Sequence, residues 1–339
     1  MTGTEAASLI DKPEVSIGFC KATLRGIGRT HPELSWHAER MLSRAFNLRY
    51  SDEPDFLIYG DAGSGEHLMY PATTLRIFVT GENVAPNWDE ADYALTHQRV
   101  YSERHWRIPL HRHWYDSTCS VPIRDFDIVR SRVDRFCNFI FSNPRALDRI
   151  VFFDLLSGYK HIDSPGKVRN NIAGPVPDKY ALVNRSKFTI AFENVSEPGY
   201  ATEKIIQPLL AGSIPIYWGD PTIEQDFNPD AFVNVHRFGS FEAAVEEVIR
   251  IDQDEALWEK YVTAPIFRND KIPVELSDEA IIGFFDRMFA RRKSHVSPFT
   301  KTLQRSGHII RHSRGFHRAL EMKRGAERRI RSFLTRRSI

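Results

Sequence analysis

Cysteine is scarce in this 339-residue chain, and its distribution excludes a disulfide framework. The three cysteines, Cys20, Cys119 and Cys137, are widely spaced, odd in number and without the CxxC or Cys/His spacing of a metal site. Free thiols of this kind are typical of small buried groups in a reducing compartment. We therefore expect a cytoplasmic protein without structural disulfides.

Long apolar runs are also missing. The N-terminal segment contains no apolar stretch flanked by basic residues, so no signal peptide is predicted. Nowhere does an uninterrupted apolar stretch approach the roughly 20 residues of a membrane-spanning helix. Internal repeats and low-complexity linkers are absent as well, whereas 42% of the residues are hydrophobic and 12% are aromatic. This composition and length predict a folded protein of two domains.

The chain has little net charge, but the two signs are separated along the sequence. The formal net charge is +2, yet residues 291–339 contain 15 Lys and Arg against two Glu. The apolar residues of this segment fall near one helical face: Ile309, Phe316, Leu320, Ile330 and Leu334. We predict a basic amphipathic tail over residues 293–339 that lies on an anionic membrane surface, so that the protein is peripheral on the cytoplasmic membrane. Gly315 and Gly325 interrupt the pattern, so a solvated tail is the alternative, and no nucleic-acid partner is expected.

Short apolar runs alternate with helical patterns along the chain. Strands are predicted for Val15–Cys20, Phe56–Tyr59, Leu75–Val79, Phe136–Phe141, Lys187–Phe192, Ile214–Trp218 and Phe232–Val235. Helices are predicted for Glu33–Phe46, Pro144–Tyr159, Thr202–Ala211, Phe241–Ile251, Glu255–Val262 and Asp278–Arg292. Strands that alternate with helices imply parallel βαβ units. The predicted fold class is therefore α/β, with two halves that meet near residue 130 and face each other across a cleft.

One strand-to-helix junction gathers polar groups between two apolar runs. The loop VSEPGY leads to Thr202, which is a good N-cap for the helix EKIIQPLLA. Such loops form the binding sites of parallel folds, and the first turn of a helix attracts anions. Lys204 is unfavourable to the helix dipole unless an anion offsets it, so we expect an external phosphate there. Glu203 can then accept ribose hydroxyls, and Tyr200 adds a hydroxyl and an apolar face. The junction predicts a nucleoside diphosphate site, whereas a capped surface helix is the structural alternative.

The sequence around this junction resembles a known family. The block FTIAFENVSEPGYATEKIIQPLLAGSIPIYWGDP, residues 188–221, is similar to the signature of the α-1,3/4-fucosyltransferases of glycosyltransferase family 10. The similar stretches within it are AFEN, YxTEK, PLLAG and IPIYWG. Two shorter segments extend the resemblance over most of residues 80–221, namely VTGENVAPNW and FCNFIFSNPRALDRIVFFDLLSGYK.

The resemblance implies a fold, a reaction and a set of site residues. The implied architecture is GT-B, with an acceptor-binding Rossmann-like domain over residues 1–130 and a GDP-fucose-binding Rossmann-like domain over residues 131–292. Glu82 of the TGEN segment corresponds to the catalytic base of an inverting α-1,3-fucosyltransferase. The implied reaction is a single displacement that moves L-fucose from GDP-fucose to an N-acetylglucosamine-containing glycan, without a tightly bound cofactor or a metal. The residues expected to bind the donor nucleotide are Arg149, Asn194, Tyr200, Glu203 and Lys204.

Several alternatives stay open from the residues alone. An inverting enzyme of the same architecture with another nucleotide-sugar donor is the second reading, and a non-catalytic glycan-binding protein is the third. The Asp125–Asp127 pair has the Asp-x-Asp spacing of a metal site but lies outside the similar segments, so we interpret it as a charged turn. His105, His111 and His113 lack further ligands at a chelating spacing, which leaves an acceptor-facing loop or plain packing for this segment.

Overall fold

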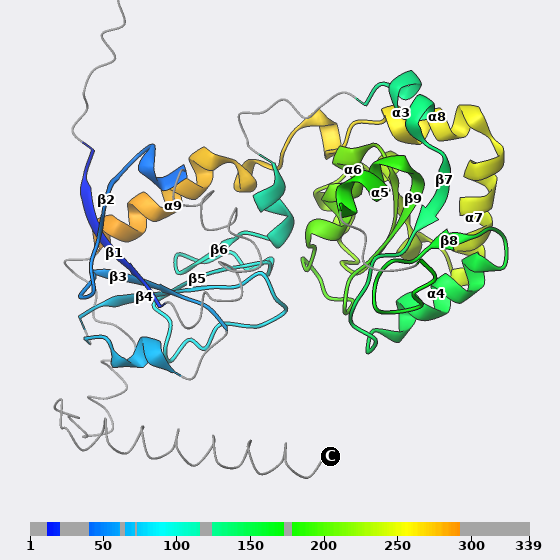
Figure 1. Ribbon diagram of the computed structural model, residues 1–339. Coiled ribbons are helices and arrows are strands. Elements are labelled where there is room, and N and C mark those ends of the chain that lie inside the picture. The colour runs from blue at the N-terminus through cyan, green and yellow to red at the C-terminus, as the bar shows by residue number, and fades with distance from the viewer. Residues whose placement is uncertain are drawn as a thin grey trace, which may run out of the picture.

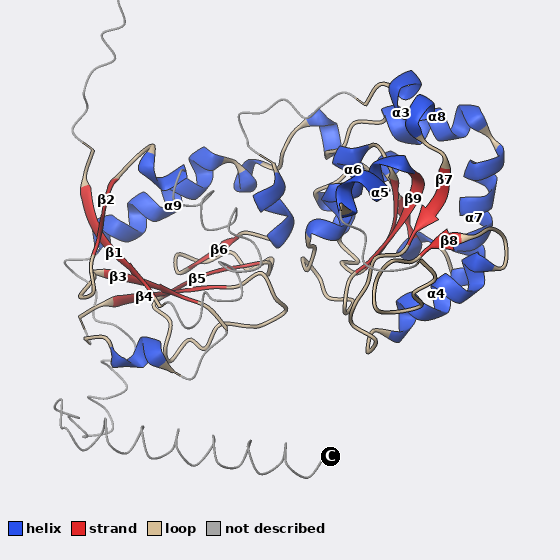
Figure 2. Cartoon of the chain, viewed as in Figure 1, coloured by secondary structure: helices blue, strands red, loops and turns tan. Residues whose placement is uncertain are grey.

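The computed structural model describes residues 12–20, 41–61, 65–71, 73–115, 124–172 and 178–291. These residues form two lobes, each built on a sheet of parallel strands with helices packed against it (Figures 1 and 2). The expected α/β class is thereby confirmed. The predicted tail and most of the predicted helix Glu33–Phe46 lie outside the described residues. Within the described ranges, every helix is too short or too polar to cross a bilayer.

The first lobe contains a six-stranded sheet of order β2-β1-β3-β4-β5-β6, in which all neighbouring strands are parallel. Its strands are β1 (Glu14–Phe19), β2 (Asn47–Tyr50), β3 (Phe56–Tyr59), β4 (Leu75–Val79), β5 (Tyr93–Thr96) and β6 (His105–Arg107). The 3₁₀ helices of this part of the chain are η1 (Glu66–Met69) and η2 (Leu110–Trp114). Because β3 and β4 run parallel, the loops that carry Asp61 and Glu82 leave the sheet at the same edge.

The second lobe contains a five-stranded parallel sheet of order β11-β10-β9-β7-β8. Its strands are β7 (Arg135–Asn138), β8 (Ile162–Asp163), β9 (Ser186–Phe192), β10 (Ile214–Trp218) and β11 (Val233–Asn234). The α-helices that come after the strands of the first sheet in sequence are α3 (Phe126–Arg132), α4 (Leu147–Ser157), α5 (Lys179–Arg185), α6 (Glu203–Ala211), α7 (Phe241–Gln253), α8 (Glu255–Thr263) and α9 (Asp278–Ala290). The remaining 3₁₀ helices are η3 (Ile223–Gln225), η4 (Pro229–Ala231), η5 (Val235–Arg237), η6 (Arg268–Asp270) and η7 (Val274–Leu276).

Strand β9 lies in the middle of the second sheet and is covered on both faces. All seven of its residues are buried, as is usual for a parallel strand between two layers of helices. Phe188, Ile190 and Phe192 face a core formed with α4, α7 and α8. Ala191 faces a second core, to which α6 contributes. This burial on both sides fixes the position at which β9 ends and the site loop begins.

Helix α9 returns to the first lobe. Its apolar side chains pack with the first sheet, although the helix follows the whole of the second sheet in sequence (Figure 1). The residues that make this contact are Ile281, Phe284, Phe285 and Met288. The cores therefore do not follow the expected ranges 1–130 and 131–292 throughout, because α9 belongs to the second range and packs with the first.

Several predicted elements agree closely with the structure. The strands Phe56–Tyr59, Leu75–Val79 and Ile214–Trp218 have the predicted bounds, and helices α7, α8 and α9 begin at the predicted residues. Strand β7 ends at Asn138, three residues earlier than predicted. The sequence pattern does not predict β6, because two of its three residues, His105 and Arg107, are polar and are buried through partners elsewhere in the fold.

Charged side chains of the two lobes form ion pairs across the boundary between them. Arg107 donates to both carboxylate oxygens of Asp226, and Arg99 donates to the same carboxylate at 3.0 Å. Burial alone would raise the pKa of Asp226, but the neighbouring His111 and the two arginines lower it overall. Removing one partner of a buried ion pair such as this one destabilises the folded protein by about 3–5 kcal/mol. We infer that this cluster fixes how the loops of the two lobes meet.

Candidate active site

The predicted strand-to-helix junction is present between β9 and α6. Thr202 is the N-cap of α6, as expected, and its hydroxyl accepts a hydrogen bond from the backbone N–H of Lys204 at 3.5 Å. Gly212 ends the helix with φ of 75°, a left-handed conformation that favours glycine. The helix and its cap therefore place Glu203 and Lys204 in the first turn.

A buried carboxylate, Glu193, organises this turn. Glu193 follows β9 directly and is completely buried. Its Oε1 accepts the backbone N–H of Thr202 at 2.7 Å, and its Oε2 lies 2.8 Å from Lys204 Nζ. Gly219 lies alongside, where an added Cβ would come within 2.5 Å of the Glu193 side chain. The glycine of the WGD turn thus leaves room for the carboxylate.

The partner of Lys204 differs from the expected one. The sequence predicts an external phosphate as the offset for this cation, whereas the structure supplies the carboxylate of Glu193 inside the protein. Burial would lower the pKa of Lys204, but Glu193 and Glu203 raise it overall, so the ammonium stays charged. For Glu193, burial raises the pKa and Lys204 opposes this rise. Lys204 Nζ also donates to the Thr202 hydroxyl at 2.9 Å, which leaves one of its three donors for a ligand.

Arg149 and Asn194 lie side by side next to Glu193. Arg149 comes from the first turn of α4 and is 1% exposed. Its Nη2 donates to the backbone oxygen of Glu193 and to Asn194 Oδ1, both at 2.7 Å. Its guanidinium lies 4.2 Å from the centre of the Phe141 ring, a cation–π contact. These contacts hold the guanidinium in one place beside the exposed Asn194 side chain.

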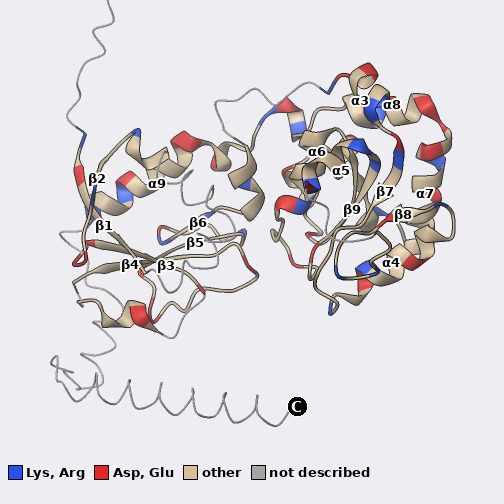
Figure 3. Ribbon diagram, viewed as in Figure 1, with Lys and Arg blue, Asp and Glu red and all other residues tan. Residues whose placement is uncertain are grey.

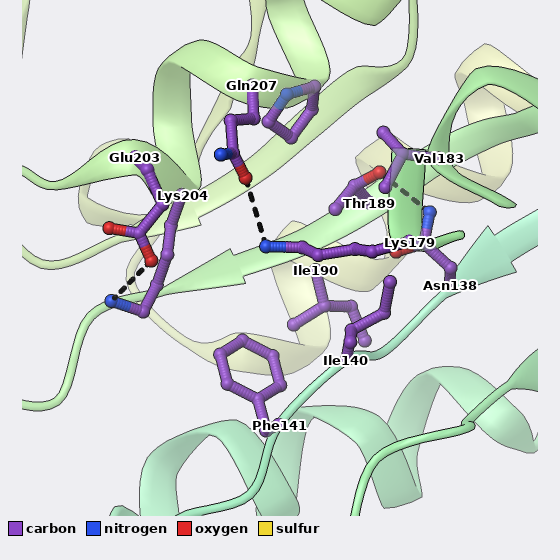
Figure 4. Close-up of a pocket in the computed structure, with 11 residues that line it drawn as sticks. Asn138, Ile140, Phe141, Lys179, Val183, Thr189, Ile190, Glu203, Lys204 and Gln207 are labelled. Carbon is purple, nitrogen blue, oxygen red and sulfur yellow. Dashed lines mark hydrogen bonds and ion pairs between the residues drawn. The ribbon is translucent and has the colours of Figure 1, made fainter. Parts of the chain in front are cut away.

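Glu203 lines a pocket between α5 and α6 (Figure 4). Its Oε1 is 3.9 Å from Lys204 Nζ. Burial alone would raise the pKa of Glu203, but the positive charges of Lys204 and Lys179 lower it overall. The group is thus an ionised carboxylate at neutral pH, able to accept two hydroxyl hydrogen bonds.

Glu82 reaches this cluster from the other lobe. It lies in the loop after β4 and is exposed, and its backbone N–H donates to the Thr80 hydroxyl at 3.0 Å. The Thr80 hydroxyl in turn donates to Asp61 at 2.9 Å. Tyr200 donates its phenolic hydrogen to Glu82 Oε2 at 3.4 Å, so the phenol meets the carboxylate rather than a residue of its own lobe. The structure therefore brings together all six predicted site residues.

The other residues considered from the sequence have different surroundings. Asp125 caps helix α3 by accepting the backbone N–H of Ile128, in keeping with a charged turn. His105 is buried and contacts the Thr96 hydroxyl and the Val100 backbone oxygen. His111 is completely buried beside Tyr115 and Asp226. His105 and His111 therefore pack inside the protein and do not face an acceptor.

Sequence reasoning did not assign Glu193 or Lys179. Glu193 lies within the AFEN stretch. The signal that could have identified it is its position directly after a strand that is buried on both faces. Lys179 lies far from the junction in sequence, at the start of α5, and only the packing of α5 against α6 brings it near Glu203. No sequence pattern shows this contact.

Comparisons with known proteins agree with this geometry. A sequence profile described as glycosyltransferase family 10 (fucosyltransferase) C-term matches residues 131–266. A second profile, described as alpha-(1,3)-fucosyltransferase FucT N-terminal domain, matches residues 32–114. The chain is 29% identical over 245 residues to the alpha-(1,3)-fucosyltransferase FucT of Helicobacter pylori, an alignment that covers 61% of this chain and 51% of that protein. It is 25% identical over 234 residues to human GDP-fucose protein O-fucosyltransferase 3, covering 61% and 48%. The chain spans about half the length of these relatives.

Solved structures show the same architecture. A crystal structure of an alpha1,3-fucosyltransferase superposes with a TM-score of 0.73 at 25% identity, covering 85% of this chain and 93% of that one. A crystal structure of alpha1,3-fucosyltransferase with GDP-fucose gives a TM-score of 0.70 at 25% identity, with coverage of 84% and 93%. The fold is thus the expected GT-B arrangement of two Rossmann-like lobes. The chain belongs to glycosyltransferase family 10, the fucosyltransferases.

Proposed function

We propose that the protein is an inverting α-1,3-fucosyltransferase that moves L-fucose from GDP-fucose to a hydroxyl of an N-acetylglucosamine-containing glycan. The observation that carries the proposal is the 3.4 Å contact between Glu82 of the first lobe and Tyr200 of the second. It sets an exposed carboxylate beside the charged cluster around Lys204. Membership of family 10 and the likeness to an alpha1,3-fucosyltransferase with GDP-fucose support the choice of donor.

Glu82 acts as the general base in this proposal. A carboxylate has two oxygens, so the hydrogen bond from Tyr200 to Oε2 leaves Oε1 to take the proton of the acceptor hydroxyl. The acceptor oxygen attacks C1 of fucose as its proton passes to Glu82, and the bond from C1 to the GDP oxygen breaks on the opposite face. The anomeric configuration inverts in this single step.

The second lobe stabilises the departing GDP. Negative charge develops on the β-phosphate, and Arg149 and Lys204 are the cations placed to meet it. Glu203 takes the ribose hydroxyls, while Asn194 and Tyr200 complete the polar contacts of the nucleotide. Removal of one such charge contact typically costs about 2.7–4 kcal/mol of transition-state stabilisation, or roughly 100- to 1,000-fold in rate.

These fixed cations do the work that a divalent metal does in many diphosphate-dependent enzymes. We therefore expect transfer to proceed without an added metal. The assay is run with and without EDTA, and equal rates are the expected result. A rate that collapses with EDTA and returns with one divalent cation would contradict this part of the proposal.

The reaction is tested by transfer from GDP-fucose to an array of glycans and peptides. Peptides are included because one relative is a GDP-fucose protein O-fucosyltransferase. GDP-mannose and UDP-sugars compete in parallel wells, since another donor is the second reading. We expect signal on N-acetylglucosamine-containing glycans that only GDP-fucose supports. Signal confined to peptides would contradict the proposed glycan acceptor, and signal from another sugar nucleotide would contradict GDP-fucose as the donor.

Membrane association is a separate proposal that concerns residues 293–339, outside the described ranges. Their 15-to-two excess of basic residues, counted from Arg291, supports binding to an anionic surface. A chain shortened after Arg292 should no longer sediment with phosphatidylserine-containing vesicles but should keep its activity on a soluble acceptor. If the shortened chain still sediments, another surface is the anchor.

A further inference from the structure

A pocket in the first lobe, at the carboxyl ends of strands β3 and β4, has no role in the steps above. Its volume is about 200 Å³, which is the space of about six water molecules at roughly 30 Å³ each, or of one sugar ring. Asp61, Val84 and Asn87 line the pocket and are exposed, so the pocket is open to solvent. A single sugar unit can therefore enter it from solution.

The pocket adjoins the loop that carries Glu82. Val84 and Ala85 of this loop line it, whereas Glu82 is not among the described residues that do so. The backbone N–H of Glu82 donates to the Thr80 hydroxyl at 3.0 Å, and this hydroxyl donates to Asp61 Oδ1 at 2.9 Å. Asp61 on the pocket wall is thus two hydrogen bonds away from the backbone of the proposed base. Because the attacked sugar lies beside the Glu82 carboxylate, the pocket is placed for the next sugar of the acceptor.

The inner wall of the pocket is apolar. Tyr59 and Phe78 line it and are buried, and the Tyr59 ring stacks on His67 with the ring centres 4.0 Å apart. A sugar ring presents C–H groups as well as hydroxyls, and an apolar wall with a few polar groups around it suits such a ligand. The wall can therefore take the C–H face of a pyranose.

The polar atoms that stay open within the described part of the pocket are mostly acceptors. Asp61 Oδ1 already accepts a hydrogen bond, and Glu90 Oε2 lies 2.9 Å from His67 Nε2, which leaves one oxygen of each carboxylate for a ligand. Asn87 Oδ1 accepts the backbone N–H of Asp89 at 3.1 Å, so the Asn87 amide nitrogen is left to donate. Two carboxylate oxygens and one amide donor match the hydroxyls of a neutral sugar, because a hydroxyl both donates and accepts.

The carboxylates also give the pocket a negative charge. Burial lowers the pKa of His67, so the imidazole is neutral and does not offset the charge of Glu90. Burial and the charge of Glu90 raise the pKa of Tyr59, as Asp92 also does, and Arg76 opposes them. An anionic group on a bound sugar would meet like charges and a single amide donor. Repulsion of this kind at a protein surface weakens binding roughly tenfold or more.

We propose that this pocket holds the acceptor sugar next to the one that receives fucose, and that Asp61 and Glu90 restrict this position to uncharged sugars. The inference rests on the proposed function, because that function supplies a glycan acceptor. It narrows the substrate class to glycans that are neutral beside the attacked N-acetylglucosamine. Glycans with an acidic sugar at that position are poor substrates.

The test measures kcat/KM for transfer from GDP-fucose to matched disaccharides on the full-length protein. The neutral probes are N-acetyllactosamine and its β1,3-linked isomer, and each is paired with a form in which C6 of galactose is oxidised to a carboxylate. We expect the wild type to prefer the neutral form at least about tenfold. Glu90→Gln and Asp61→Asn keep the side-chain shape and remove one charge each, so each should reduce this preference at least about threefold. Glu14→Gln is the matched control, because Glu14 begins β1 at the opposite edge of the same sheet and should leave the preference unchanged.

The possible results separate the inference from the proposed function. A wild type that transfers fucose to neither disaccharide nor the N-acetylglucosamine monosaccharide overturns both. Transfer to the monosaccharide alone overturns the inference only, and so do equal kcat/KM values for the neutral and carboxylated forms. A preference that stays as large in Glu90→Gln and Asp61→Asn as in Glu14→Gln overturns it as well. Both forms are measured on one preparation, so partial unfolding of a variant lowers both values and leaves their ratio intact.

Discussion

At the scale of single residues, the buried carboxylate of Glu193 connects the groups that form the donor site. It binds the backbone N–H and hydroxyl of Thr202, and it pairs with Lys204. The backbone oxygen of the same residue accepts a hydrogen bond from Arg149. One side chain and its own backbone thus position the helix cap and both cations.

Replacing Glu193 by Gln should lower the stability of the protein. The amide keeps the shape but removes the counter-charge, so the Lys204 ammonium is left without its nearest anion. Loss of one side of a buried pair costs about 3–5 kcal/mol, and we expect a fall of that size in the free energy of unfolding measured in urea. Glu224→Gln, which breaks a partly exposed pair with Arg237, is the control and should cost less than about 1 kcal/mol. Equal effects of the two variants would contradict the organising role of Glu193.

At the scale of elements, the loop from β9 to α6 is placed against the first lobe by a glycine. Gly199 has φ of 82°, and a Cβ at this position would lie 2.5 Å from the backbone oxygen of His97. The neighbouring residue is Tyr200, whose ring packs edge-on against His97 and whose hydroxyl reaches Glu82. The close approach of the two backbones allows the Tyr200 hydroxyl to contact Glu82.

Gly199→Ala should reduce transfer by moving the loop. The added methyl group meets a backbone oxygen that cannot rotate away, and alanine in the left-handed region costs roughly 1–2 kcal/mol by itself. We expect kcat/KM for transfer to fall at least about tenfold. Gly239→Ala serves as the control, since a Cβ there meets nothing within 4 Å. Wild-type kcat/KM in Gly199→Ala would show that the loop position does not matter.

How far the sequence predicts these elements depends on what buries them. Strand β10 and the helix after β9 are evident from the apolar run Ile214–Trp218 and from the cap, stop and spacing of Thr202–Ala211. Strand β6 is not, because Arg107 in it is buried only through Asp226 of the other lobe. The site residues likewise differ in whether the sequence identifies them. The resemblance points to Glu82 and Lys204, whereas the contact of Lys179 with α6 arises from tertiary packing and leaves no local pattern.

At the scale of the whole molecule, the two lobes share a buried, charged junction, and residues of both charge signs are scattered along each lobe (Figure 3). Among the residues that the structure describes, four histidines are buried in the first lobe and around its junction with the second: His67, His97, His105 and His111. Burial lowers the pKa of each of them, and burial and the charge of Arg107 lower that of His97 to about 4. These residues are therefore neutral in the folded protein at physiological pH.

The protein should lose stability as the pH falls below about 6.5. The unfolded chain then takes up protons on histidines that stay neutral in the folded state, so the unfolded form is favoured. The contribution of His97 alone is present above its ordinary pKa of 6.5 and is lost down to about 4, which amounts to about 3 kcal/mol. His97→Gln should flatten the fall in unfolding free energy over this range. A slope in His97→Gln identical to that of the wild type would contradict the assignment.

The central claim is that the first lobe supplies the base and the second lobe holds the donor. The most direct test measures turnover with GDP-fucose and the affinity for GDP on one variant, Glu82→Gln. A base that only takes a proton contributes roughly 100- to 10,000-fold to the rate, so turnover should fall by that factor while GDP binds as tightly as to the wild type. Glu203→Gln should show the opposite pattern, with weakened GDP binding. If Glu82→Gln keeps most of its turnover, or loses GDP affinity in step with it, this division between the lobes is wrong.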